Sequence, residues 1–278
     1  MKKTLILIAL IGSSFQVFSN EDAYVTYTGE VLQCNFNKGR DLDKVLDFVR
    51  NDWYELADSY PAPYEGNVVT PQLYDDNEGY DLYWVGFTTN NNAMGQVLDW
   101  FSVNGTKTFA KWQSLVDCAS WSQWDIFEVR ANQTDYQEGD NNIWALHSCS
   151  FKQGKGASDI RENDNVWNEF LDSLDHKGGV WRWWAAGGSS LEETNDFYVN
   201  MGFSSMTEYG NYRDARLKSL VDGTYPETIA DCLPPRVYSV NNIKAIKPGK
   251  VTLTFSLDNV EATINLNAVS YTHLTLPT

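Results

Sequence analysis

The sequence predicts an α+β fold in which one βαββαβ unit occurs twice along the chain. Two cysteine pairs indicate the duplication, because the separation of Cys34 from Cys118 and that of Cys149 from Cys232 differ by a single residue. Each earlier cysteine opens a similar stretch, Cys-Asn-Phe-Asn-Lys-Gly in one case and Cys-Ser-Phe-Lys-Gln-Gly in the other, and each later cysteine follows an aspartate. A near-constant period of this kind is typical of tandem copies of one structural unit.

Copy one, residues 20–132, is predicted to have the order strand, helix, strand, strand, helix, strand. Runs rich in apolar and β-branched residues, separated by polar turns, predict its strands at Val31–Phe36, Val68–Tyr74, Tyr80–Phe87 and Trp124–Arg130. Apolar residues that recur at intervals of three and four predict a first helix over Leu42–Ala57 and a second from Met94 to Val116, interrupted at Asn104-Gly105.

Copy two, residues 142–247, repeats this order after a polar linker at residues 133–141. Its strands are predicted at Trp144–Phe151, Val180–Trp184, Phe197–Phe203 and Val237–Lys244. Its helices are predicted at Ile160–Leu174, which ends before Gly178-Gly179, and at Met206–Val221. Residues 248–269 could add a β-hairpin, and residues 270–278 match neither copy, so we interpret them as a non-native tail.

The predicted order is that of two tandem ferredoxin-like βαββαβ units, packed as an intramolecular pseudo-dimer. In this topology the end of the first strand lies beside the start of the fourth, which is where each cysteine pair falls. Four cysteines allow three pairings, and the repeat favours Cys34–Cys118 with Cys149–Cys232. Free or metal-binding cysteines are the alternative, but there is no Cys-x-x-Cys and no histidine cluster, so we expect no metal site.

Residues 1–19 are predicted to be a signal peptide. Lys2 and Lys3 precede the short apolar run Leu5–Ile11, and Val17 and Ser19 form a small-residue cleavage site. A buried N-terminal strand or helix is the alternative interpretation. No later segment has the roughly 20 apolar residues of a membrane helix, so we expect a soluble periplasmic or secreted protein in which disulfides can form.

The chain carries a formal net charge of −16. A protein with this charge repels phosphate backbones and anionic membrane surfaces, so we expect neither nucleic acid nor a membrane surface as a partner. Motifs for nucleotide binding, for zinc proteolysis and for a serine nucleophile are all absent from the sequence. The sequence therefore gives no signature of a particular reaction and indicates no cofactor.

The predicted element order resembles the dimeric α+β barrel superfamily, which includes antibiotic-biosynthesis-type monooxygenases and stress-responsive barrel domains. A closer resemblance is to a group of uncharacterised exported proteins of marine bacteria. It is carried by Cys34–Leu42, Ala62–Asn67, Tyr83–Phe87 and Gly178–Trp183. The first resemblance implies a barrel formed by two ferredoxin-like units, and the second implies no activity.

The candidate ligand residues lie in copy two. Trp181, Arg182, Trp183 and Trp184 are consecutive in a predicted strand, where they could form an aromatic-walled pocket with an arginine for an anionic group. The alternative is a sheet-to-sheet core with the arginine stacked on indole. His147 could serve as a general base beside them, or it could be a core histidine, since its counterpart in copy one is a leucine.

Three functions are consistent with these features. A non-enzymatic exported protein that binds a small molecule in copy two is favoured by the 11 tryptophans and by the missing catalytic signature. A cofactor-independent oxygenase of the barrel type, using His147 and Arg182, is the second hypothesis. The third is a structural, envelope-associated protein with an exposed apolar patch and no pocket.

Overall fold

The computed structural model describes residues 24–74, 79–134, 137–190, 194–245, 250–257 and 260–267. The predicted signal peptide and the predicted tail lie outside these residues. In the described part of the chain, no helix combines the length and the apolar character needed to cross a membrane.

Copy one has the predicted order of elements, with two long strands at its ends. Its helical elements begin where polar side chains cap them: the Asp41 side chain accepts a hydrogen bond from the Lys44 amide, and Asn90 accepts one from the Ala93 amide at 2.9 Å. The elements are β1 (Thr26–Phe36), α1 (Leu42–Phe48), a π-helical turn (Val49–Trp53), α2 (Tyr54–Ala57), β2 (Glu65–Leu73), β3 (Leu82–Thr88), α3 (Asn91–Asn104), α4 (Thr106–Leu115) and β4 (Val116–Arg130).

Copy two repeats this order, with its last strand divided in two. Pro234 and Pro235 lie at the division, where their missing amide hydrogens cannot contribute to the sheet. The elements are β5 (Asn141–Phe151), a 3-10 turn (Ala157–Asp159), α5 (Ile160–Ser173), β6 (Val180–Gly187), β7 (Phe197–Phe203), α6 (Met206–Asp222), β8 (Ala230–Cys232) and β9 (Arg236–Lys244). Beyond them, β10 (Lys250–Leu257) and β11 (Val260–Asn267) pair as a hairpin.

The two sheets close into one antiparallel barrel. The strand order is β7-β6-β4-β1-β3-β2-β9-β5, and β5 pairs with β7 to complete the ring, while β8 extends the edge beside β5. Within each copy the first strand lies between the third and the last, as the ferredoxin-like topology requires. The copies join twice, through β4 with β6 and through β2 with β9, so the predicted intramolecular pseudo-dimer is confirmed.

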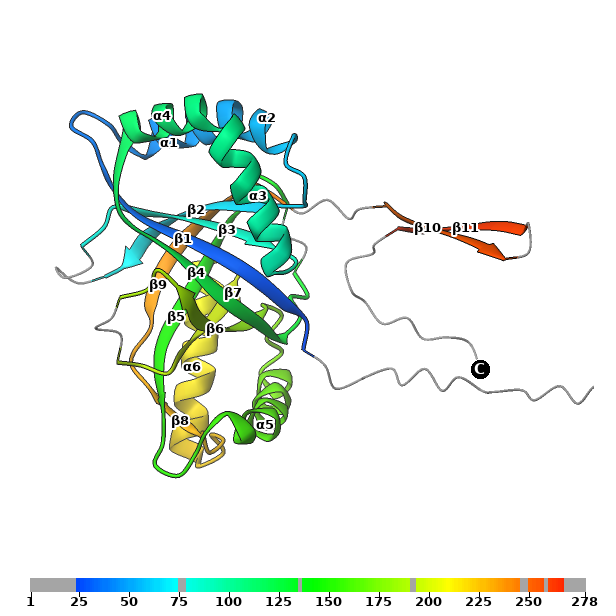
Figure 1. The fold of residues 1–278 in the computed structure, drawn as a ribbon. Helices are drawn as coiled ribbons and strands as arrows, with labels where there is room; N and C mark the ends of the chain where they lie inside the picture. The colour runs from blue at the N-terminus through cyan, green and yellow to red at the C-terminus, as the bar shows by residue number, and fades with distance from the viewer. Residues whose placement is uncertain are drawn as a thin grey trace, which may run out of the picture.

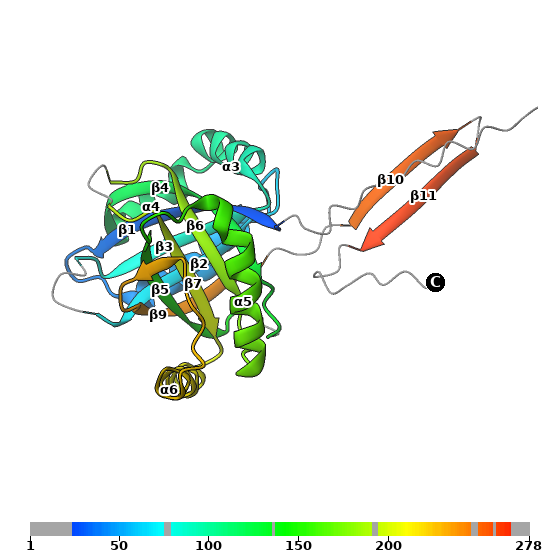
Figure 2. The same cartoon turned by 90° about the horizontal axis from the view of Figure 1, so that it is seen from below.

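Three layers of core follow from this closure. Figure 1 shows α1 to α4 covering one side of the barrel and α5 and α6 covering the opposite side, and the view from below in Figure 2 keeps α3 and α6 apart in the same way. The core between the sheets takes residues from both copies, whereas each copy has its own core between sheet and helices. Each copy therefore encloses a separate sheet-to-helix interior.

Both predicted disulfides are present. Cys34–Cys118 and Cys149–Cys232 each join residues that face each other across an antiparallel strand pair. The two disulfides show which residues of the copies are equivalent. Cys34 lies opposite Leu82 on the neighbouring strand, and Cys149 lies opposite Phe197, so Leu82 and Phe197 occupy equivalent positions. By this correspondence Phe87 is equivalent to Gly202 and not to Phe203: Phe87 packs between the sheets, whereas Phe203 packs beneath the helices.

Candidate functional site

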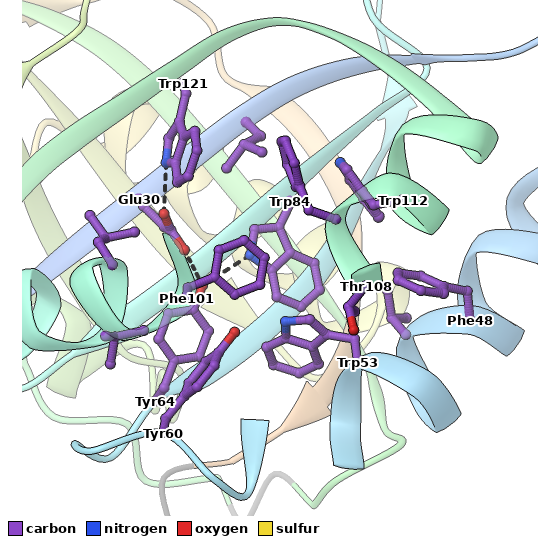
Figure 3. A pocket seen from close by; sticks show the side chains of 15 residues that line it. Glu30, Phe48, Trp53, Tyr60, Tyr64, Trp84, Phe101, Thr108, Trp112 and Trp121 are labelled. Carbon is purple, nitrogen blue, oxygen red and sulfur yellow. Dashed lines mark hydrogen bonds between the residues drawn. The ribbon is translucent and has the colours of Figure 1, made fainter. Parts of the chain in front are cut away.

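A cavity lies in copy one between the sheet and the helices α1, α3 and α4 (Figure 3). Its volume is about 50 Å³, which is enough for several water molecules at about 10–15 Å³ each. Nine of the fifteen lining side chains are aromatic; the lining is Glu30, Leu32, Phe48, Val49, Trp53, Tyr60, Tyr64, Trp84, Val97, Leu98, Phe101, Thr108, Phe109, Trp112 and Trp121.

A buried carboxyl group is the polar centre of this apolar cavity. Glu30 is 5% exposed and lies between Trp121 and Tyr64, as Figure 3 shows. The Trp121 indole donates a hydrogen bond to Oε2 at 2.7 Å, and the Tyr64 hydroxyl donates a short one to Oε1. Trp84 Nε1 in turn donates to the Tyr64 oxygen at 2.9 Å. The network holds both carboxyl oxygens in fixed positions at the wall of the cavity.

Strand periodicity places Glu30 at this wall. On β1 alternate residues point to the same face, so Glu30 shares its face with Leu32 and Cys34, which belong to the sheet-to-helix core of copy one. The π-helical turn after α1 begins at Val49 and ends at Trp53, and both residues line the cavity from the opposite side. Such turns insert one residue into a helix and are frequent at functional sites.

Two glycines make room for the aromatic rings. Gly66 on β2 is paired with Gly86 on β3. A side chain on Gly66 would overlap the rings of Trp53 and Trp84, and one on Gly86 would overlap Tyr64. The glycine pair is therefore the surface on which the hydrogen-bonded aromatic network lies.

The environment of Glu30 favours its neutral form. Burial raises the pKa of this carboxyl group, and the hydrogen bonds from Tyr64 and Trp121 oppose that rise. Burial and the nearby Glu30 charge also raise the pKa of Tyr60 and of Tyr64, so both phenols stay protonated. None of the lining residues is a lysine, arginine or histidine that could balance an ionised Glu30.

Replacing Gly86 by alanine is expected to disrupt this network. The added methyl group must displace the Tyr64 ring, which breaks its hydrogen bonds to Glu30 and from Trp84. Overpacking of a core costs about 1–3 kcal/mol, and the free energy of unfolding measured with guanidinium chloride should fall by at least that amount. Gly95→Ala is the matched control: no atom lies near the added methyl group in α3, and we expect stability to rise by about 0.5–1 kcal/mol. Equal effects of the two substitutions would contradict this packing.

The tryptophans predicted to bind a ligand do not line this cavity. Trp181 and Trp183 point into the core between the sheets, where the Trp183 ring lies 5.6 Å from that of Phe87 and 6.2 Å from that of Trp144. Trp184 points to the other face and packs against Phe151 and Phe197. Their placement is that of core residues, and a ligand role for them stays a prediction.

The Arg182 guanidinium forms an ion pair with a carboxylate of its own copy. Its guanidinium donates to Asp164 of α5 through two bonds, of 3.0 Å from Nη1 and 2.6 Å from Nη2. Both residues are almost fully buried. The alternative interpretation placed this arginine on an indole ring; in the structure the guanidinium lies over the ring of Phe197, at 5.2 Å. The anionic group that Arg182 binds is thus the carboxylate of Asp164.

His147 lies two strands away from Arg182, on the same face of the sheet, with Val199 between them. Its ring is half-buried, and Nδ1 lies 3.1 Å from the Leu233 carbonyl oxygen. Burial lowers the pKa of His147 to about 4, so the ring is neutral at pH 7. His147 does not line the described cavity, and its role as a general base stays a prediction.

Sequence reasoning missed Glu30, although a signal for it exists. Glu30 precedes Cys34 by four residues, so it shares that cysteine's face of the strand, and the equivalent residue before Cys149 is Ala145. A carboxyl group at a position where the other copy has a buried alanine marks a difference between the copies.

No family model matches the chain, and no curated protein matches it. Several solved structures are similar in architecture. A protein of Lactobacillus acidophilus provisionally named a monooxygenase has 10% identity and a TM-score of 0.44, with 86% of this chain and 100% of that chain covered. A protein of Fusobacterium nucleatum with the same provisional name has 10% identity and a TM-score of 0.49, covering 80% and 94%. A mutant chlorite dismutase of Candidatus Nitrospira defluvii has 8% identity and a TM-score of 0.45, covering 79% and 92%.

This chain folds as an α+β barrel with eight antiparallel strands. The strand order and the two joints between the copies establish that architecture, with both halves of the barrel supplied by one chain. Its two disulfides indicate an oxidising, extracytoplasmic location. Identities of 8–10% carry no activity from the similar structures to this α+β barrel.

Proposed function

We propose that this protein is an exported, non-enzymatic binding protein that holds a small molecule in the cavity of copy one. The supporting observation is the cavity itself, which has nine aromatic side chains and one buried carboxyl group. Ligand pockets are typically apolar concavities with a few fixed polar groups, and this lining has that composition. The sequence-based hypothesis of a binding protein is kept, and its proposed site moves from copy two to copy one.

A thermal-shift screen tests the proposal. A ligand present at about 100 times its Kd stabilises a protein by about 2.7 kcal/mol, which corresponds to a rise in Tm of about 5–10 °C for a chain of this size. The screen should include sugars, aromatic acids, haem, neutral aromatic compounds and amines. We expect the shift produced by a hit to be lost in Leu98→Trp, which fills the cavity from α3, and retained in Trp183→Ala. The opposite pattern would place the site in copy two.

A second candidate is an enzyme that uses Glu30 to transfer a proton. The raised pKa of this carboxyl group favours it, because general acids are often carboxyl groups kept neutral by burial. The oxygenase hypothesis that assigned chemistry to His147 and Arg182 gains no support from the cavity, which neither residue lines. Incubating a hit with the protein and analysing it by mass spectrometry separates the candidates: an unchanged compound supports binding alone, and a product supports the enzyme.

The structural, envelope-associated alternative predicts an apolar patch in place of a pocket, and the copy-one cavity argues against it. The closer resemblance to exported marine-bacterial proteins, carried by Cys34–Leu42 and Gly178–Trp183, stays a prediction. The resemblance names no ligand, so the chemistry of the cavity is the guide to its occupant.

A further inference from the structure

We infer that the ligand of the copy-one cavity is a small organic cation, an amine or a quaternary ammonium compound, whose charge pairs with Glu30. This inference rests on the proposed binding function and specifies its ligand class. It depends on three features of the cavity: its charge, its aromatic walls and the hydrogen-bonding capacity that its polar atoms leave unused.

The charge of the lining is unbalanced. Glu30 is the one acidic residue among the fifteen that line the cavity, and none of the fifteen is basic. Among the described residues its hydrogen-bond partners are the neutral groups of Tyr64 and Trp121. A buried carboxylate without a cation is unfavourable, and one that gains a cationic partner is stabilised. A cationic ligand would supply the missing charge, whereas an anionic ligand would meet the carboxylate and no basic group.

The walls favour a cation for a second reason. The faces of tryptophan and tyrosine rings attract cations, and cages of such rings are the usual binding sites of quaternary ammonium groups. Figure 3 shows Trp121 and Tyr64 at the Glu30 carboxyl group, and the rings of Tyr60, Trp53, Trp84 and Phe101 line the same cavity. These rings also hold one another in place, since the Tyr60 ring lies 5.4 Å from that of Tyr64 and 6.3 Å from that of Trp53. The cage is therefore built before the ligand enters.

The unused hydrogen-bonding capacity indicates where a ligand would make contact. Each Glu30 oxygen accepts one bond from the aromatic network, and a carboxylate oxygen can accept more than one. Trp112 also lines the cavity, and its indole N–H is buried without a partner in the described part of the chain. A cation that carries a hydroxyl or carbonyl oxygen could satisfy this donor. Choline, a quaternary ammonium alcohol, is thus a suitable probe.

The protonation of Glu30 gives the inference a pH signature. The titratable groups that face Glu30 are Tyr60 and Tyr64, which stay neutral, and the elements α3 and α4 bring only apolar, aromatic and threonine side chains to the cavity. Burial raises the pKa of Glu30 in the free protein, and a bound cation lowers it again. Choline has no ionisable ammonium proton, so its affinity should increase as the pH rises through the Glu30 pKa, with release of a proton on binding.

Isothermal titration calorimetry with choline and with its neutral isostere 3,3-dimethylbutan-1-ol tests the inference on the full chain. We expect choline to bind at least about tenfold more tightly than the isostere, because a desolvated cation–π contact alone contributes that much. Glu30→Gln removes the charge and keeps one acceptor oxygen for the Trp121 N–H, while its amide NH2 can donate to the Tyr64 oxygen. It should weaken choline binding by about tenfold or more and leave the isostere unaffected.

Glu65→Gln is the matched control, because burial raises the pKa of Glu65 too, but Glu65 does not line the cavity. Choline affinity should be the same in this variant as in the natural chain. Equal affinities of the two probes, or choline binding that is unchanged in Glu30→Gln, would overturn the cation inference while leaving the binding function in place. Failure of choline to bind would also overturn it. Loss of the proposed function is a separate result, namely a compound screen with no hit sensitive to Leu98→Trp.

Discussion

Replacing Asp164 by alanine is expected to lower the free energy of unfolding by about 3–5 kcal/mol, the usual cost of removing one partner from a buried ion pair. Asp164 is 2% exposed and accepts both bonds from Arg182, together with a bond of 2.6 Å from the Tyr24 hydroxyl group. The substitution leaves the guanidinium buried without a counter-charge. It also removes the contact that fixes α5 to β6.

Chemical denaturation with guanidinium chloride measures this loss, and two variants make the result specific. Asp52→Ala removes one partner of an exposed ion pair with Lys111 that also joins separate elements, and we expect a loss below about 1 kcal/mol. The double replacement Asp164→Leu with Arg182→Met exchanges both charges for apolar groups, which is often neutral or stabilising. The interpretation fails if Asp164→Ala is no more destabilising than Asp52→Ala.

The repeat in the sequence carried the fold prediction because it combines two kinds of information. The cysteine spacing defined the unit, and the hydrophobic period defined its elements, so topology followed without a family motif. Closure of the sheets into a barrel followed from the resemblance and is confirmed by the pairs β4–β6 and β2–β9. Phe197–Phe203, a short and strongly apolar strand, was predicted with both bounds correct.

The two largest errors in the predicted strand bounds have a common physical cause. β1 begins at Thr26, not Val31, and β4 begins at Val116, not Trp124. In both cases the missed part has polar residues at buried or half-buried positions, which removes the apolar alternation that marks a strand. The missed part of β1 contains Thr28 and Glu30, both buried. The polar residue that weakened the strand signal is thus the one that gives the cavity its charge, as expected where function and folding preferences compete.

The candidate site could not be located from the sequence because Trp53, Trp84 and Trp183 share both residue type and burial, and only the packing around them differs. Trp181 and Trp183 fill the core between the sheets, whereas Trp53 and Trp84 leave a cavity beneath the helices. That difference depends on the π-helical turn and on the glycine pair of β2 and β3. Neither feature has a period or a motif that reveals it in advance.

Removing either disulfide by a pair of cysteine-to-alanine replacements is expected to destabilise the protein by about 4.5 kcal/mol in the chain-entropy model. The bridged residues are 84 positions apart in copy one and 83 apart in copy two, so this model predicts the same loss for both. Guanidinium denaturation of Cys34→Ala with Cys118→Ala, and of Cys149→Ala with Cys232→Ala, measures the two losses. Treatment of the natural chain with a reductant should have a larger effect than either variant.

Comparison of the two variants shows whether the disulfides stabilise the protein by restricting the unfolded chain or by improving packing in the folded one. Cys34 and Cys149 are both fully buried, but Cys34 belongs to the large core beneath the helices of copy one and Cys149 to a small cluster. If the bridges act by restricting the unfolded chain, the two losses are equal. A larger loss in copy one would instead locate the effect in native packing around Cys34, next to the wall that carries Glu30. In that case the same variant should also weaken ligand binding in the cavity, while the copy-two variant should not.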